Sequence, residues 1–429
     1  MAKTYRPYVP EQDLLLPPSL REWLPEDHLA FFVSDLIDQL DLSAITSVYE
    51  DEDRGFPPYH PVMLTKVVVY AYCVGVFSSR RIQRRLVEDV GFRVLAAGNE
   101  PDFRTIADFR KRHLPALRGF FEQVLRLARE LGAPRVGRVA LDSSKVKANA
   151  SKHKAMSYGR MREKQRQLRE EVTQLLDQAE AADAAEDAEY GADRRGDELP
   201  AELQRRESRL ARIREAKRAL EARAKDEATA AGQPTESAKP DPKAQYNFTD
   251  PESRIMKGPD GFVQAYNVQV AVDDLQLIVG QAVTQATNDK KQLRPMITTI
   301  EQQSGDTPSQ VLADAGYCSD ESLTAIAKTR IDAYISTRKQ KHGERPGPCP
   351  RGPLPETATI VDRMSRKLHT KAGAAVYAAR KGIVEPVIGQ IKQARGFRQF
   401  LLRGFEKVQG EWSLVCTTHN ILKLYRLCV

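Results

Sequence analysis

The sequence predicts an α/β protein in which helices flank a mixed sheet, preceded by an all-helical region. The clearest strand signal is 262–272, where apolar and polar residues alternate before an Asp-Asp turn, and 276–283 returns as the second strand of a hairpin. The short apolar runs 136–141 and 310–313 are each followed by an aspartate, as buried strands are when the next residue faces a cleft. Helical patterns separate the later strands, which indicates crossover connections and parallel pairing.

Residues 1–132 are expected to form an all-helical N-terminal domain. The segment 62–77 indicates a buried helix, and a basic helix follows at 80–87. After a turn, 103–112 is again helical in pattern. The last two helices are either the solvated surface of a helical domain or a helix-turn-helix module against DNA. The cations that would then contact DNA are Arg80, Arg81, Arg84 and Arg85 on the first helix and Arg104, Lys111 and Arg112 on the second.

The composition changes sharply from about residue 161 to about 230, within an insertion expected at 153–240. Most of this stretch is Glu, Arg, Lys, Gln and Ala, with apolar residues at coiled-coil spacing on both sides of a polar loop at 191–196. We therefore expect two antiparallel helices inserted into the α/β domain that spans 133–429. The insertion is either a projecting arm or a partly disordered linker.

Three acids occur where the sheet would present them to a common edge. Asp142 and Asp314 follow the two apolar runs, and Glu385 lies in a helical pattern at 369–393. Two Asp and one Glu could hold two Mg²⁺ or Mn²⁺ ions, because hard oxygen ligands suit these metals, and such a pair cuts and rejoins phosphodiesters. The other acids that flank strands and the histidines without neighbours at ligand spacing are assigned to turns, to the core or to the surface: Asp273, Asp274, Asp289, His153, His369 and His419.

The net charge and the cysteine content indicate the kind of partner and the compartment of the protein. The formal charge is +8 and the pI is about 9.1, which suits a polyanionic partner. The five cysteines are scattered, without zinc spacing, which favours a reducing compartment. No apolar signal core begins the chain, and the run 62–77 is too short to span a bilayer. We expect a soluble cytoplasmic protein.

Several of these segments resemble the DDE transposases of bacterial insertion sequences. The similar motifs are Val-Ala-Leu-Asp142-Ser-Ser, Leu-Ala-Asp314-Ala-Gly-Tyr, and the segment from Tyr377 through Arg380 and Glu385 to Lys392. The resemblance implies a ribonuclease-H-like catalytic domain, with Asp142 on its first strand, Asp314 at the end of its fourth and Glu385 on a helix against the sheet. It also implies that these three acids are catalytic and bind the metals, and it favours DNA binding by the basic N-terminal helices.

The family signature on the last of these segments is Tyr-x2-Arg-x3-Glu-x6-Lys, and this chain departs from it. Four residues separate Arg380 from Glu385, so Lys381 stands at the expected distance instead. On an ideal helix Tyr377, Lys381, Glu385 and Lys392 share one face. The candidates for contacting DNA beside the metals are Tyr377, Arg380, Lys381 and Lys392.

The function expected from the resemblance is DNA transposition. The enzyme would hydrolyse a phosphodiester at a transposon end and then use the freed 3′-hydroxyl to attack target DNA in the same site. Its partners would be the terminal inverted repeats and the target duplex, with a homodimer on DNA in the nucleoid of a bacterial cytoplasm. Two alternatives remain open: a metal-dependent nuclease without strand transfer, and a non-catalytic DNA-binding protein derived from a transposase.

Overall fold

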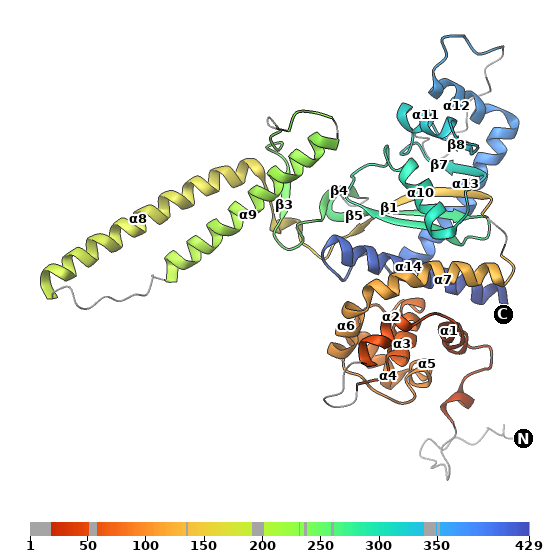
Figure 1. The fold of residues 1–429 in the computed structure, drawn as a ribbon, viewed down its shortest axis with the longest axis horizontal. Coiled ribbons are helices and arrows are strands. Elements are labelled where there is room, and N and C mark those ends of the chain that lie inside the picture. The colour runs from red at the N-terminus through yellow and green to blue at the C-terminus, as the bar shows by residue number, and fades with distance from the viewer. Residues whose placement is uncertain are drawn as a thin grey trace, which may run out of the picture.

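A computed structural model describes residues 19–50, 58–133, 136–190, 201–230, 232–235, 238–258, 261–338, 349 and 352–428. Figure 1 shows a helical N-terminal part, a layer formed by α7 (Leu114–Glu130) and α14 (Phe405–Cys428), a sheet covered by further helices, and a long two-helix arm. The mixed α/β architecture predicted from the sequence is confirmed, and its sheet contains both parallel and antiparallel pairs.

The N-terminal part consists of short helices whose apolar stripes face inward. Helix α3 (Pro61–Cys73) is buried along most of its length, which is why its sequence is apolar all round. Helix α4 (Ser79–Glu88) buries Ile82 and Leu86 and exposes its arginines. The remaining elements of this part are a 3₁₀ turn (Leu20–Trp23), α1 (Leu29–Asp38), α2 (Ser43–Glu50), α5 (Val90–Leu95) and α6 (Phe103–Arg112).

The sheet has the strand order β4-β5-β1-β7-β8, with β6 also paired to β5. Strand β1 (Arg138–Lys147) lies at its centre, antiparallel to β5 (Gly261–Asp273) and parallel to β7 (Gln310–Ala313). The hairpin partner of β5 is β6 (Ile278–Thr284), and β7 pairs in parallel with β8 (Asp332–Ile335). This arrangement is the one expected for a ribonuclease-H-like sheet.

The helices around the sheet lie close to the predicted ranges. Helices α10 (Leu293–Ser304) and α11 (Asp320–Ala327) make the crossovers before β7 and β8. The chain then forms α12 (Ile360–His369), which the sequence reading missed, and α13 (Lys371–Gly389). A π-helical turn at Gln390–Ala394 follows α13 and changes the phase of the residues beyond Gly389.

The arm consists of α8 (Tyr158–Tyr190) and α9 (Ala201–Ala230), the antiparallel helix pair predicted from the sequence (Figure 1). The predicted loop at 191–196 lies outside the described residues. A small apolar cluster holds the helices together near the body and is separate from the main core. Its buried members are Met161, Leu168, Leu210, Ile213, Ala216, Leu220 and Tyr246.

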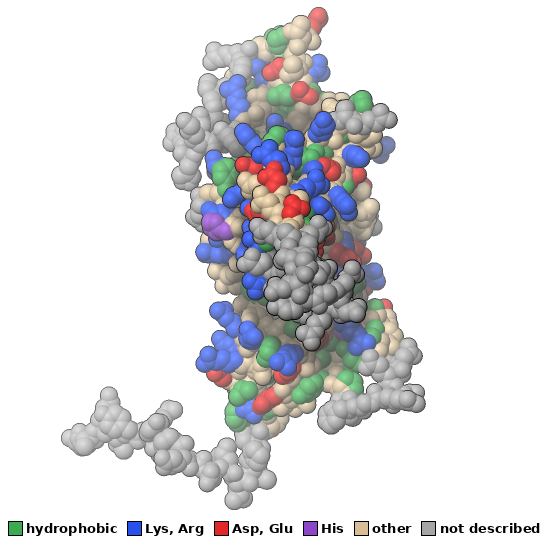
Figure 2. All heavy atoms as spheres, turned by 90° about the vertical axis from the view of Figure 1, so that its left-hand side faces the viewer, with side chains coloured by type: hydrophobic (Ala, Val, Ile, Leu, Met, Phe, Trp, Pro, Cys, Tyr) green, Lys and Arg blue, Asp and Glu red, His purple; other side chains and the backbone are tan. Residues whose placement is uncertain are grey.

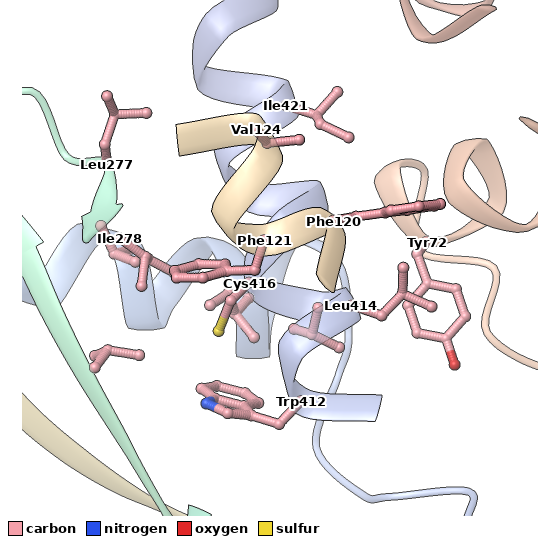
Figure 3. Close-up of a cluster of buried hydrophobic side chains, with 14 of the residues drawn as sticks. Tyr72, Phe120, Phe121, Val124, Leu277, Ile278, Trp412, Leu414, Cys416 and Ile421 are labelled. Atoms are coloured by element: carbon pink, nitrogen blue, oxygen red, sulfur yellow. The ribbon is translucent and has the colours of Figure 1, made fainter. Parts of the chain in front are cut away.

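One continuous core joins the N-terminal helices to the sheet. Figure 3 shows side chains from α3, α7, α14 and the start of β6 meeting in a single buried cluster. The close approach of α14 to α7 depends on Gly410, because a Cβ there would lie 2.5 Å from Cγ of Leu114. Arg110 of α6 donates to the hydroxyl of Tyr72 at 3.1 Å, and that hydroxyl donates to Glu411 of α14 at 3.3 Å.

Some predicted boundaries were wrong. Strand β1 does not end at Asp142 but runs on to Lys147, because residues 142–147 pair with β5. Three short strands were not predicted: β2 (Ala155–Ser157), β3 (Gln245–Asn247) and β4 (Arg254–Gly258). Such lengths are too short for a period-two pattern to stand out from loop sequence. Among the helices that the structure describes, none combines the length and apolar character needed to cross a membrane.

Candidate active site

The register of the sheet brings Asp142 and Asp314 side by side. Strands β1 and β7 are parallel, with Ala140 opposite Leu312. Two residues further along each chain come Asp142 and Asp314, so both reach the same edge of the sheet on neighbouring strands about 5 Å apart. Two acids that are far apart in sequence are therefore adjacent because of parallel pairing.

Helix α13 supplies a cation to this edge. Nη1 of Arg380 lies 3.7 Å from Oδ2 of Asp142, and the Arg380 side chain is only 11% exposed. Tyr377, one turn earlier, is close enough to be influenced by the charges of both Arg380 and Asp314, and burial raises its pKa. These two residues form the side of α13 that faces the sheet edge.

Of the two cations that the family spacing left open, Arg380 is the one beside Asp142. Lys381 is exposed, whereas its neighbour Arg380 faces Asp142. Glu385 is exposed on α13, but its charge still acts on Asp142. Tyr377, Lys381 and Glu385 recur every four residues within α13, as a shared face requires, but Lys392 lies beyond this helix on the π-helical turn. Tyr377 is half-buried, whereas Lys381 and Glu385 are exposed.

Lys392 reaches the far end of β1. Its Nζ donates to Oγ of Ser144 at 2.8 Å and to the carbonyl oxygen of Lys145 at 3.3 Å. Burial lowers the pKa of this lysine, and the charge of Arg398 lowers it further. Lys392 thus ties the segment after α13 to the strand that carries Asp142.

Negative charge accumulates around Asp142. Burial raises the pKa of Asp142 to about 6, against the opposing effects of the Arg380 charge and the hydrogen bond from the Ser143 amide. The carboxylates of Asp314 and Glu385 raise it as well. A raised carboxyl pKa with a specific set of charged neighbours is typical of a functional site.

A fourth acid, Asp289, lies at the same edge, although the sequence analysis assigned it to a turn. Its Oδ1 accepts hydrogen bonds from the side-chain amides of Asn267 and Gln269, both at 2.7 Å. Its Oδ2 accepts one from Oγ of Ser143 at 2.8 Å, and Nζ of Lys145 lies 3.8 Å from Oδ1. Asp289 is therefore linked directly to Ser143, the residue that follows Asp142.

Two buried amides of β5 account for the position of Asp289. Asn267 and Gln269 are two residues apart on β5, so both amides point to the same face of the sheet. Both residues are completely buried, and buried amides require polar partners. Two inward amides in an apolar strand thus predict a buried acceptor near by, and Asp289 is that acceptor.

The Asp-Ala-Gly-Tyr run has a structural explanation at this edge. The Gly316 amide donates to Oδ1 of Asp314 at 2.9 Å, and a Cβ at Gly316 would lie 2.9 Å from that same oxygen and 3.4 Å from Oδ2 of Asp289. Tyr317 is buried and its hydroxyl donates to Oε1 of Gln269. The glycine leaves room for two carboxylates, and the tyrosine fixes an amide that holds one of them.

Two buried cationic groups at this edge have no hydrogen-bond partner within the described part of the chain. They are Nζ of Lys145 and Nη1 of Arg380. A buried donor without a partner is unusual in a folded protein and indicates a group that a ligand completes. Donors of this charge suit the oxygens of a phosphodiester.

The donors suit a hard divalent cation in their chemistry. Asp142, Asp314 and Glu385 offer only carboxylate oxygens, and their mutual repulsion is what a divalent ion relieves. The described residues contain no group of three or more His, Cys, Asp or Glu side chains arranged to hold a metal. The register joins Asp142 to Asp314, while Glu385 stands at the exposed side of α13.

The predicted DNA-binding cations of the N-terminal part are exposed. Arg80, Arg81, Arg84 and Arg85 line the outer side of α4, and Arg104, Lys111 and Arg112 are exposed on α6. Helices α4 and α6 are in contact, and the guanidinium of Arg80 lies 4.8 Å from the ring centre of Phe103. Arg110, within the same basic stretch, is instead buried.

Comparison with known proteins identifies two regions of the chain. Residues 18–112 match a family model described as "Transposase domain (DUF772)", and residues 232–421 match one described as "Transposase DDE domain". No curated protein and no solved structure matches the chain. The second match contains Asp289, Asp314 and Glu385, and the first contains α4 and α6. The chain belongs to the DDE transposases of the insertion-sequence type.

Proposed function

We propose that this transposase cleaves phosphodiester bonds at transposon ends and transfers the freed 3′-hydroxyl to target DNA at the edge formed by Asp142 and Asp314. The observation that carries the proposal is the pairing of these two acids with two cations, Lys145 and Arg380, each of which has a buried nitrogen without a hydrogen-bond partner among the described residues. Acids for a metal and cations for a phosphate are the two requirements of phosphoryl transfer.

Asp142, Asp314 and Glu385 are proposed to hold the divalent metals, Mg²⁺ or Mn²⁺. When bound, such a pair supplies an activated nucleophile and stabilises the leaving oxygen. Arg380 and Lys145 would neutralise the non-bridging oxygens of the scissile phosphate. Lys392 orients the end of β1 through Ser144, and Asp289 orients Ser143 and Lys145 from the other side.

We propose a separate role for each of the three regions predicted from the sequence. Residues 1–132 would bind DNA through α4 and α6, residues 133–429 would carry the chemistry, and 153–240 would be an insertion. Support for the insertion comes from its separate apolar cluster. Because two transposon ends must be joined in one event, we also propose a homodimer on the terminal inverted repeats.

The direct test is strand transfer in Mg²⁺ with the flanking repeats of the element as substrate. A recessed duplex of a transposon end should be joined to a plasmid by the wild type, and Glu385→Gln should lose both cleavage and joining. If the wild type cleaved the duplex but did not join it to the plasmid, the protein would be a nuclease without strand transfer. Full activity of the Glu385→Gln variant would show that Glu385 is not one of the catalytic acids.

A further inference from the structure

Besides α4 and α6, positive charge is concentrated at the root of the arm, where the end of α9 and the segment 238–245 meet the start of β4. A cavity of about 560 Å³ opens there between α9, the segment 238–245 and the start of β4. Two acids, Glu227 and Asp241, also contribute to its wall. The cations that line it outnumber them: Arg223, Lys239, Lys243 and Arg254.

The two arginines of this cavity are held close together by a shared acceptor. Nη2 of Arg223 and Nη1 of Arg254 both donate to the carbonyl oxygen of Pro251, at 3.3 Å and 3.1 Å. Burial lowers the pKa of Arg254 to about 10, and the charge of Arg223 lowers it further. The charge of Glu227 acts on both arginines and offsets their repulsion in part. An anion beside Arg223 would relieve this repulsion.

A second hollow continues the positive surface along the arm. It has a volume of about 270 Å³ and is lined by Arg162, Arg166, Arg169 and Lys217, with Glu170 as its acid. Lys217 is one helical turn before Leu220, which lines the first cavity, so the two hollows are consecutive along α9. Figure 2, which looks at the arm end-on, shows Lys and Arg side chains gathered around it.

One residue in the wall of the root cavity is close in sequence to the proposed catalytic edge. Thr287 lines the cavity and stands two residues before Asp289, whose carboxylate hydrogen-bonds Ser143 in the site. From Lys217 to Ala228 the two hollows extend over eleven residue steps of α9, or about 16 Å of helix. That length matches about five base pairs of duplex at roughly 3.4 Å each.

We propose that the root of the arm binds the phosphate backbone of duplex DNA and guides that duplex toward the acids at the sheet edge. Lys239 and Lys243, both exposed, would contact phosphates at the mouth of the cavity, and Arg223 would contact one further in. This inference rests on the proposed transposase function. The competing occupant is an acidic protein segment, such as residues 180–189 of a second copy, which are rich in Asp and Glu.

The test compares two double variants of the full chain that remove the same charge. Lys239→Ala/Lys243→Ala alters the cavity, and Arg218→Ala/Lys225→Ala alters exposed cations of α9 that line neither hollow. A labelled duplex of the terminal repeat is titrated without divalent metal between 50 and 300 mM KCl. Each lost phosphate contact should reduce the slope of log Kd against log salt by about 0.9.

We expect the cavity variant to lose about two units of slope and roughly tenfold or more in affinity at 100 mM salt, while the control variant matches the wild type. Equal slopes in all three proteins, or equal losses in both variants, would overturn the inference. So would a loss of self-association in sedimentation with DNA binding intact, which would assign the cavity to a second copy. Wild-type strand transfer, measured in parallel, separates these outcomes from a failure of the proposed function.

Discussion

The proposed catalytic edge, which contains Asp142 and Asp314, and the arm use charge in opposite ways. At the edge, most charged side chains are half-buried and their partners come from distant parts of the chain, as when Asp289 bonds Ser143 across 146 positions. On the arm, ion pairs join the two inserted helices or successive turns of one helix and stay partly exposed, as in Arg206 with Glu171. Buried, multiply bonded charges are strongly coupled to their surroundings, whereas exposed pairs are screened by water. Substitutions of charged residues should therefore have large effects on activity at the edge and small effects on stability in the arm.

The largest effect is expected for Asp314→Asn. The change removes one of two adjacent carboxylates while keeping the shape that accepts the Gly316 amide. Cleavage of a transposon-end duplex in Mg²⁺ should fall on the order of 10³-fold or more, since a metal ligand acts on every step of the chemistry. Asp320→Asn, at an exposed acid of the following helix, is the matched control and should keep wild-type rates. Equal cleavage rates for the two variants would contradict the role proposed for Asp314.

Asp289→Asn should have the next largest effect. The amide keeps the shape but removes the charge beside Lys145, so the cleavage rate should fall roughly 10- to 100-fold, as for residues that orient metal ligands. Because Asp289 is a positioning residue, the loss should appear in kcat, with the Kd for DNA changed less than about twofold. Asp274→Asn is the control, because sequence analysis placed both acids in turns and Asp274 is half exposed. A Kd effect without a rate effect would assign Asp289 to DNA binding.

The contrast between Asp274 and Asp289 also shows what the sequence could predict. Local patterns were sufficient for the hairpin β5–β6, for β7 and for the arm, because each depends on periodicity within one segment. The adjacency of Asp142 and Asp314 followed from parallel pairing, which crossover helices imply. The choice between Arg380 and Lys381, and the burial of Asp289, depend on how α13 rotates against the sheet and on a loop folding back onto β1. No local periodicity records those tertiary contacts.

A buried titratable group outside the site, His419, extends the comparison to stability. Burial lowers the pKa of His419 to about 3, helped by the charge of Arg395, and its Nε2 donates to the carbonyl oxygen of Gln276 at 3.0 Å. The folded state therefore keeps His419 neutral while the unfolded chain takes up a proton below about pH 6.5. Unfolding free energy should fall as pH drops from 6.5 toward 3, by about 2 kcal/mol from this residue between pH 7 and pH 5.

Urea unfolding of the wild type and of His419→Gln at pH 7, 6 and 5 measures the contribution of His419 to the pH dependence of the unfolding free energy. The glutamine can donate to the same carbonyl but does not titrate, so the wild type should lose more stability than the variant across the interval. Parallel curves for the two proteins would mean that water reaches His419 in the folded state.

The smallest effect is expected for Arg206→Ala on the arm. Nε of Arg206 lies 3.1 Å from Oε2 of Glu171, and the two side chains are 34% and 43% exposed. Exposed pairs of this kind contribute about 0.2–1 kcal/mol, so unfolding free energy should change by less than about 1 kcal/mol, and by less still at 0.5 M salt. Leu210→Ala, at a buried position one turn along α9, is the contrasting variant and should cost about 2–5 kcal/mol in the unfolding of the arm. If Arg206→Ala destabilised the arm as much as Leu210→Ala, the ion pair would be buried in solution, and the arm would share the catalytic edge's dependence on buried charge.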